Sequence, residues 1–235
     1  MQPTLGVLVF IPTFNDHAHL ADLVRRVAAL PLACRALVLD DGSSAPVQPD
    51  GLGGGALLAR LPDNFGLGMC THVAFDHALT AGYQYAVRID ADGQHSVEDI
   101  PALIAPLAAG QADIVAGSRT NHRAQGGWLR IAIKAYFAAT ARLMTSGQAP
   151  QDVNTGFFAV NRAAMVRLNT FRLERYPEPQ MYVLACRNGL RLADVAIAQR
   201  ERGFGRSSLD SFGAIRMWYR FSVFVLAELL RRRPS

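Results

Sequence analysis

Apolar and polar residues alternate in blocks along the first half of the chain. Residues 6–11 form a continuous apolar run rich in β-branched side chains, which is typical of a strand buried on both faces. The same pattern predicts strands at residues 36–39, 56–61, 85–89 and 113–116, and helices beginning at Asp16 and spanning about 68–80 and 97–109. Strands that alternate with helices predict an α/β fold with a mostly parallel, Rossmann-like sheet.

The second half of the chain is less regular. Helices are expected at residues 128–144 and 181–187, strands at 157–160 and 192–197, and a last helix within 212–233. No linker-like break separates the two halves. We therefore expect one domain over residues 1–210, followed by a basic amphipathic helix over 211–235.

Polar residues gather where the predicted strands end. The four polar segments are residues 12–16, 40–44, 90–94 and 117–119. Parallel strands end at one edge of a sheet, and ligands bind there. The sequence thus predicts that the four segments converge on a single cleft.

Two of these segments carry paired carboxylates. Asp90 and Asp92 can both meet one divalent cation, and hard oxygen ligands favour Mg²⁺ or Mn²⁺. Gln94 could add a carbonyl oxygen or a water-mediated contact. A carboxylate of the Asp40–Asp41 pair could accept a hydrogen bond from a nucleobase. Each pair also fits a simple alternative, a solvated turn in the first case and a turn that caps the next element in the second.

Seven short motifs follow one another between residues 11 and 208. They are residues 12–16, 40–43, Asn64 with Gly66 and Gly68, 90–95, 117–119, 152–157, and Arg202 with Gly205 and Ser207. In this order they resemble the family 2 glycosyltransferases with the GT-A fold, especially the branch similar to dolichyl-phosphate mannose synthase. The resemblance covers most of the chain.

The resemblance implies a role for each motif. The donor-binding residues would be Pro12, Phe14, Asp16, Asp41, Asp90 and Ser207. The ligands of Mg²⁺ or Mn²⁺ would be Asp90, Asp92 and Gln94. The catalytic residues would be Asp92, Arg119 and Arg202, with both arginines on phosphate oxygens. Residues 152–157 would shape the sugar pocket.

The resemblance also implies an inverting transfer from a nucleotide-diphosphate sugar, with a polyprenyl phosphate as the expected acceptor. A lipid phosphate is already nucleophilic, whereas a hydroxyl acceptor would need a base such as Glu178. Gln180 stands where a second glutamate is expected, and His72 and Ala74 also depart from the family pattern, which leaves the sugar open. A catalytically silent sugar-nucleotide-binding or membrane adaptor protein and a nucleotidyltransferase are the rival interpretations.

Charge distribution bears on the partners. The net charge is +5, and the last 35 residues hold seven arginines against three acidic residues. Trp218 and Tyr219 precede an apolar block at 221–230 that is too short to span a bilayer. This pattern favours a helix lying on an anionic membrane surface, while a helix packed on the domain stays open. We expect a cytoplasmic protein at the inner face of the membrane, without nucleic acid and with room for a membrane-protein partner.

The sequence gives little support for a P-loop, a dinucleotide-binding motif, a disulfide framework or a zinc site. The glycine run at 51–55 lacks a following Lys-Ser/Thr, and no G-x-G-x-x-G motif follows the first strand. The three cysteines are widely spaced in apolar surroundings, which favours a reduced protein. The histidines show no zinc-binding spacing, and we expect His95 at the surface.

Overall fold

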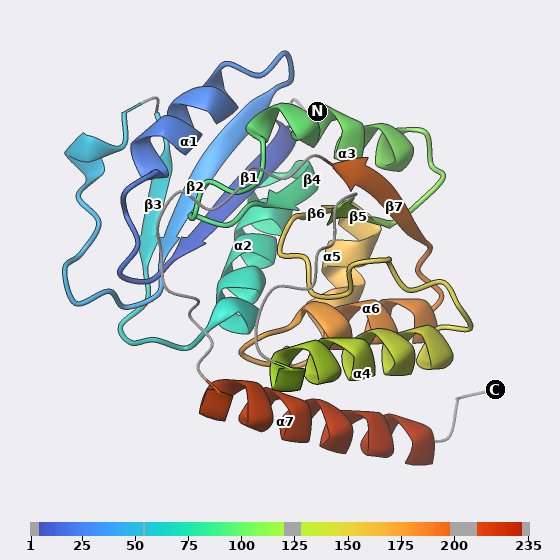
Figure 1. Ribbon diagram of the computed structural model, residues 1–235. Helices are drawn as coiled ribbons and strands as arrows, with labels where there is room; N and C mark the ends of the chain where they lie inside the picture. The colour runs from blue at the N-terminus through green and yellow to red at the C-terminus, as the bar shows by residue number, and fades with distance from the viewer. Residues whose placement is uncertain (1–4, 54, 120–127, 198–210, 232–235) are drawn as a thin grey trace.

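A seven-stranded sheet with helices on both faces forms the protein (Figure 1). The structure, a computed structural model, describes residues 5–53, 55–119, 128–197 and 211–231. The strand order is β3-β2-β1-β4-β6-β5-β7, and β6 runs antiparallel to both of its neighbours. The other strand pairs are parallel, so the expected mostly parallel α/β fold is confirmed.

The strands and helices follow the predicted alternation. The strands are β1 Leu5–Thr13, β2 Cys34–Asp40, β3 Leu57–Arg60, β4 Tyr83–Arg88, β5 Ile114–Arg119, β6 Phe158–Asn161 and β7 Leu192–Ile197. The helices are α1 Leu20–Ala28, α2 Leu67–Ala81, α3 Ile100–Ala108, α4 Trp128–Met144, α5 Arg162–Leu168, α6 Glu178–Arg187 and α7 Ser211–Leu230.

The core lies on both faces of the sheet. On β1, Leu8 and Phe10 point to the face covered by α2, α5 and α6, while Val9 and Ile11 point to the face covered by α1 and α3. All four side chains are fully buried, which explains why the strand reads as a continuous apolar run.

Four elements differ most clearly from the expectation. Helix α1 begins at Leu20, four residues after the predicted start at Asp16. Helix α5 was not predicted; it begins where the Oδ1 atom of Asn161 accepts a hydrogen bond from the Ala164 amide at 2.8 Å. Strand β5 continues through Arg119 instead of ending at residue 116, because its last residues pair with β7. Helix α6 starts at Glu178, three residues earlier than expected.

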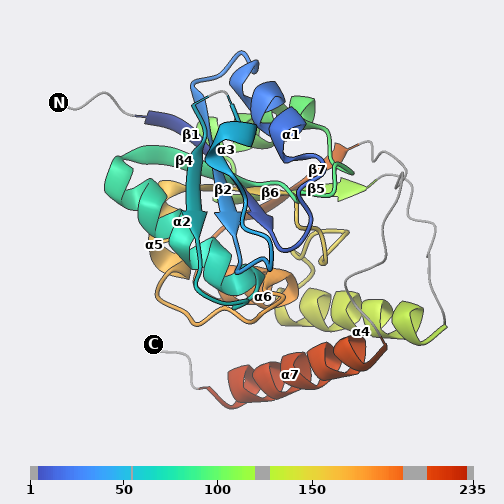
Figure 2. The ribbon, with the colours of Figure 1, turned by 90° about the vertical axis from the view of Figure 1, so that its left-hand side faces the viewer.

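Helix α7 packs against α4 and α6 at one end of the molecule, and its axis runs alongside that of α4 (Figures 1 and 2). Phe221 of α7 packs edge-on against Phe137 of α4, with ring centroids 5.1 Å apart. Over the residues that the structure describes, no helix combines the length and the apolar character needed to cross a membrane.

Candidate active site

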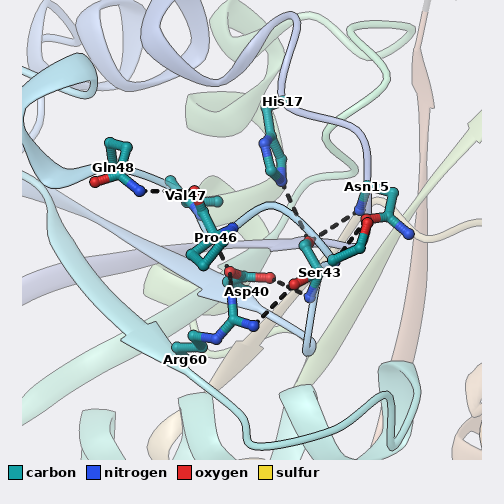
Figure 3. Close-up of polar contacts among 9 residues, drawn as sticks. Asn15, His17, Asp40, Ser43, Pro46, Val47, Gln48 and Arg60 are labelled. Atoms are coloured by element: carbon teal, nitrogen blue, oxygen red, sulfur yellow. Dashed lines mark hydrogen bonds and ion pairs between the residues drawn. The ribbon is translucent and has the colours of Figure 1, made fainter.

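The loops that follow β1 and β2 are tied together at the carboxyl edge of the sheet (Figure 3). The Asp41 amide donates to the Thr13 carbonyl at 2.9 Å, and the Asn15 amide donates to the Ser43 hydroxyl at 2.9 Å. The His17 ring lies 3.2 Å from the same hydroxyl. Two of the predicted polar segments therefore form one unit.

Asp40 organises the second loop from within. Its carboxylate accepts hydrogen bonds from the amides of Ser43 at 2.8 Å and Val47 at 3.2 Å, and from Arg60 at 2.7 Å. Burial alone would raise the pKa of Asp40, but these donors outweigh burial and hold the pKa below its ordinary value. Asp40 therefore acts as the residue that caps the turn after β2, which is the simpler of the two interpretations given for the Asp40–Asp41 pair.

Asp41 connects the second loop to the start of α2. Its two oxygens accept from the amides of Phe65 at 2.9 Å and Gly66 at 2.8 Å. Desolvation raises the pKa of this buried carboxyl group. A carboxylate can accept more than two hydrogen bonds, so this arrangement leaves acceptor capacity for a base N–H. Gly42 is required beside it, because a Cβ there would lie 2.4 Å from the Asp63 carbonyl carbon.

The other predicted nucleoside contacts lie on the first loop. Pro12 is buried at the end of β1, whereas Phe14 and Asp16 are exposed. The Asp16 carbonyl accepts from the Thr13 hydroxyl, which closes the turn. The ring of Phe14 is exposed, and it follows Thr13, whose carbonyl is bonded to the Asp41 amide; such a ring offers a face on which a nucleobase can stack.

Asp90 and Asp92 follow β4 directly. Arg88 donates to Oδ1 of Asp90 through Nη2 at 2.8 Å and Nε at 3.1 Å. A Cβ on Gly156 would lie 2.3 Å from Oδ2 of Asp90, so the carboxylate rests on the glycine backbone. Oδ1 of Asp92 accepts from the Gln94 amide at 3.1 Å.

These residues suit a divalent cation. Within the described ranges, no group of three or more His, Cys, Asp and Glu side chains could hold a metal ion. The closely spaced carboxylates of Asp90 and Asp92 with the amide of Gln94 offer hard oxygen ligands, and the remaining positions would fall to water and phosphate oxygens. The glycine cradle under Asp90 keeps its carboxylate in place, so the donor set fits Mg²⁺ or Mn²⁺.

The loop after β4 also approaches the loop after β1. A Cβ on Gly93 would lie 3.2 Å from the His19 ring. His95 is buried, and its ring stacks on Phe157 with centroids 5.0 Å apart. The expectation of a surface position for His95 was therefore wrong, because the loop folds back onto the segment before β6.

Residues 152–157 attach to the end of β5. The Gly117 amide donates to the Phe157 carbonyl at 2.8 Å, and the Thr155 hydroxyl donates to the Gly117 carbonyl at 2.9 Å. The backbone of Arg119 pairs with Ile197 of β7 at the same sheet edge. Arg202 and Ser207 lie outside the described residues.

Sequence reasoning missed the role of Arg88. This side chain is almost fully buried, and its Nη1 donates to Glu178 at 2.6 Å. The signal was present in the sequence, since Arg88 is the one charged residue in the predicted strand at 85–89. A charge at a buried position requires partners, and Asp90 and Glu178 supply them.

Comparison with known proteins identifies the family. The model described as "Glycosyl transferase family 2" matches residues 8–171. The chain therefore belongs to glycosyl transferase family 2, as the motifs indicated.

Named relatives refine this assignment. The chain is 30% identical to a polyprenol monophosphomannose synthase of Mycolicibacterium smegmatis over 89% of this chain and 83% of the relative. It is 29% identical to an undecaprenyl-phosphate mannosyltransferase of Micrococcus luteus, over 88% of each.

A solved structure shares the fold. Glucosyl-3-phosphoglycerate synthase from Mycobacterium tuberculosis, in complex with Mn²⁺, uridine-diphosphate and phosphoglyceric acid, superposes with a TM-score of 0.71 at 19% identity. The match covers 96% of this chain and 79% of that chain.

Proposed function

We propose that this glycosyltransferase moves a sugar from a nucleoside-diphosphate sugar to a polyprenyl phosphate, with inversion at the anomeric carbon. The observation that carries the proposal is the placement of Asp90 and Asp92 at the sheet edge where the loop of Asp41 also lies. The names of the two relatives, polyprenol monophosphomannose synthase and undecaprenyl-phosphate mannosyltransferase, support this acceptor class.

The donor would lie along the carboxyl edge of the sheet. Pro12, Phe14, Asp16 and Asp41 would surround the nucleoside, and Asp90, Asp92 and Gln94 would hold Mg²⁺ or Mn²⁺. The cation, when bound, would neutralise the charge of the departing diphosphate. Structures of the similar glucosyl-3-phosphoglycerate synthase with Mn²⁺ or Mg²⁺ and uridine-diphosphate support this arrangement.

The acceptor would be oriented by Arg119 and Arg202, whose planar guanidinium groups can each hold two phosphate oxygens. Ser207 would orient Arg202. A phosphate oxyanion attacks without prior loss of a proton, so no side chain has to act as a base.

The position of Glu178 favours the phosphate acceptor over a hydroxyl acceptor. Glu178 would be the base for a hydroxyl, yet the residue is only 5% exposed and is paired with Arg88 at 2.6 Å. A carboxylate that is enclosed and already engaged by an arginine is poorly placed to take a proton from a hydroxyl acceptor.

The outer face of α7 supports contact with a membrane. Its exposed side chains are largely apolar and include Ile215, Trp218, Tyr219, Val223, Leu226, Leu229 and Leu230. Arg216 and Arg220 are exposed on the same helix, and the exposed Arg231 follows its last residue. An apolar strip with basic neighbours is suited to the headgroup region of an anionic bilayer, where the lipid-linked acceptor resides.

In this proposal residues 1–210 form the catalytic unit and 211–235 bring it to the membrane. The protein would work at the cytoplasmic face, peripherally attached, where nucleotide sugars are available. Charged partners would then be the lipid surface and the substrates, and no nucleic acid is involved.

The test is a transfer assay with purified full-length protein. Nucleotide sugars of guanine and uracil would be offered with a polyprenyl phosphate in detergent, with Mn²⁺ or with excess EDTA. A glycosyl-phosphoryl-polyprenol that forms only with the metal supports the proposal. Sugar transfer to a hydroxyl acceptor alone, pyrophosphate release from a nucleoside triphosphate, or no reaction with any donor would contradict it.

A further inference from the structure

A buried guanidinium contacts Asp90, one of the two carboxylates assigned to the donor cation. The Arg88 side chain is 2% exposed, and the Phe158 ring lies under its guanidinium carbon at 6.0 Å. Its donors divide between two partners: Nη2 and Nε contact one oxygen of Asp90, and Nη1 contacts Glu178. One fork thus spans the end of β4 and the first residue of α6.

This arrangement restrains Asp90 from two sides. Arg88 takes Oδ1, while Oδ2 rests against Gly156, where a Cβ would come within 2.3 Å. The Asp90 side chain is 33% exposed, so part of the carboxylate stays accessible at the carboxyl edge of the sheet although Oδ1 is held by Arg88. A planar fork fixes an orientation that a single point charge would not.

The charges around Arg88 also suit a site for a divalent cation. Asp90 and Glu178 place two negative charges on one guanidinium, and Asp92 adds a third carboxylate two residues after Asp90. Glu178 is buried with a side chain 6% exposed, so its charge requires the neighbouring cation. With Glu178 neutralised by Arg88, the charge left for the cleft is that of two carboxylates, which matches a divalent ion.

We propose that Arg88, anchored by Glu178, is a positioning residue: by holding Oδ1 of Asp90 it keeps the carboxylate against Gly156, in the orientation in which its exposed part meets the donor cation. The inference rests on the proposed function, because it presumes that Asp90 binds the cation. It assigns the Arg88–Glu178 pair to preparing the cation site, a role distinct from that of a general base.

A double variant can remove the hydrogen bonds that position Asp90 without changing the net charge near the cation site. Arg88→Met/Glu178→Met removes one positive and one negative charge, so the net charge is unchanged. Replacing a buried ion pair by apolar residues of similar size commonly preserves the fold. Mn²⁺ binding to the full chain would be measured by electron paramagnetic resonance, first with Mn²⁺ alone and then with GDP or UDP present. We expect the affinity to fall about tenfold or more, as for other outer-shell partners of metal ligands.

Two further variants test the same role in case the double variant does not fold. Arg88→Lys keeps the charge but can reach only one of the two carboxylates, and Gly156→Ala displaces Asp90 from the opposite side without substituting Arg88 or Glu178. Both should weaken Mn²⁺ binding while the circular dichroism spectrum stays that of the wild type.

The matched control is a buried arginine–glutamate pair away from the cleft. Arg187 and Glu228 join α6 to α7 at 3.0 Å, with side chains 12% and 10% exposed. Arg187→Met/Glu228→Met should leave Mn²⁺ affinity unchanged. Wild-type Mn²⁺ affinity in the folded Arg88 and Gly156 variants would overturn the positioning role alone. If the wild type itself binds no Mn²⁺ with either nucleotide, the proposed donor site falls as well.

Discussion

The side chain of Arg187 on α6 donates hydrogen bonds to both the carboxylate and the backbone carbonyl of Glu228 on α7. Nε donates to the carboxylate at 3.0 Å and Nη2 donates to the Glu228 carbonyl at 2.8 Å. Glu228 is buried, and so is Phe221, which lies two turns earlier on the same face of the helix. The inner face of α7 is therefore part of the folded domain, while its outer face is available for another role. A packed helix and a membrane-facing helix are compatible.

The outer face of α7 can be tested without disturbing the fold. Val223→Ser/Leu226→Ser should reduce flotation of the full chain with phosphatidylglycerol-containing vesicles, because both side chains are about half exposed and contribute apolar area to the surface. The remaining binding should weaken in high salt, since exposed arginines are screened. Equal flotation of variant and wild type would contradict the membrane role.

A variant of the inner face serves as the control. Phe221→Ala should lower the free energy of unfolding by about 3–5 kcal/mol, because it opens a cavity in the aromatic cluster with Phe137. Chemical denaturation in the absence of lipid measures this effect. A loss of stability below about 1 kcal/mol would show that the contact with α4 contributes little.

Asp92→Ala should abolish metal-dependent glycosyl transfer while the melting temperature stays near that of the wild type. The residue lies in a half-buried loop after β4, where a side chain seldom supports the core. Product formation with and without Mn²⁺, together with a thermal melt, measures both parts. Undiminished transfer by the variant would refute the assignment of Asp92 to the cation site.

Gln180→Glu should destabilise the protein although it introduces the residue that the family resemblance leads one to expect. The Gln180 side chain accepts from the Glu174 amide at 2.8 Å and donates to the Arg172 carbonyl at 3.1 Å. A carboxylate cannot donate, so two acceptor oxygens would face each other in a buried site. The expected cost is about 1–3 kcal/mol, measured by urea unfolding at pH 7.

The matched control for this substitution is Gln48→Glu. Gln48 is exposed, and its amide donates to the Pro46 carbonyl at 3.2 Å (Figure 3). Water can replace that bond, so the change should stay within about 0.5 kcal/mol. Equal losses of unfolding free energy at both positions would show that the hydrogen bond from Gln180 to the Arg172 carbonyl does not contribute measurably to stability.

Asp113 should make stability depend on pH in the acid range. Hydrogen bonds from Arg191 lower the pKa of Asp113 to about 2, against a value near 3.9 in the unfolded chain. The contribution is present above about pH 4 and is lost as the pH falls toward 2, because protonation removes the acceptor for Arg191. Asp113→Asn should reduce the difference in urea midpoint between pH 5 and pH 2.5. The partner variant Arg191→Met should do the same, and an unchanged difference in both would refute the ion pair's role.

The carboxylates that the motifs singled out lie where the strand pattern places them, while their roles toward the donor stay predictions. Asp41, Asp90 and Asp92 were assigned from motifs at strand ends, and the structure places all three at the carboxyl edge of the sheet. Such assignments are possible because strand ends are marked locally, by an apolar run followed by polar residues. Arg88 lay inside the apolar run, where the pattern offered no function for it.

The sequence by itself determined the α/β alternation, the positions of the polar strand ends and the amphipathic character of the last helix, because each depends on periodicities within a few residues. The tertiary structure alone decided that β6 inserts antiparallel between β4 and β5, which carries Gly156 against Asp90. It also decided that Glu178 meets Arg88, a contact 90 positions apart in the chain. These contacts follow from the order of the strands and the packing of the helices. Burial of side chains throughout the core stabilises that arrangement, so no short segment of the sequence determines it.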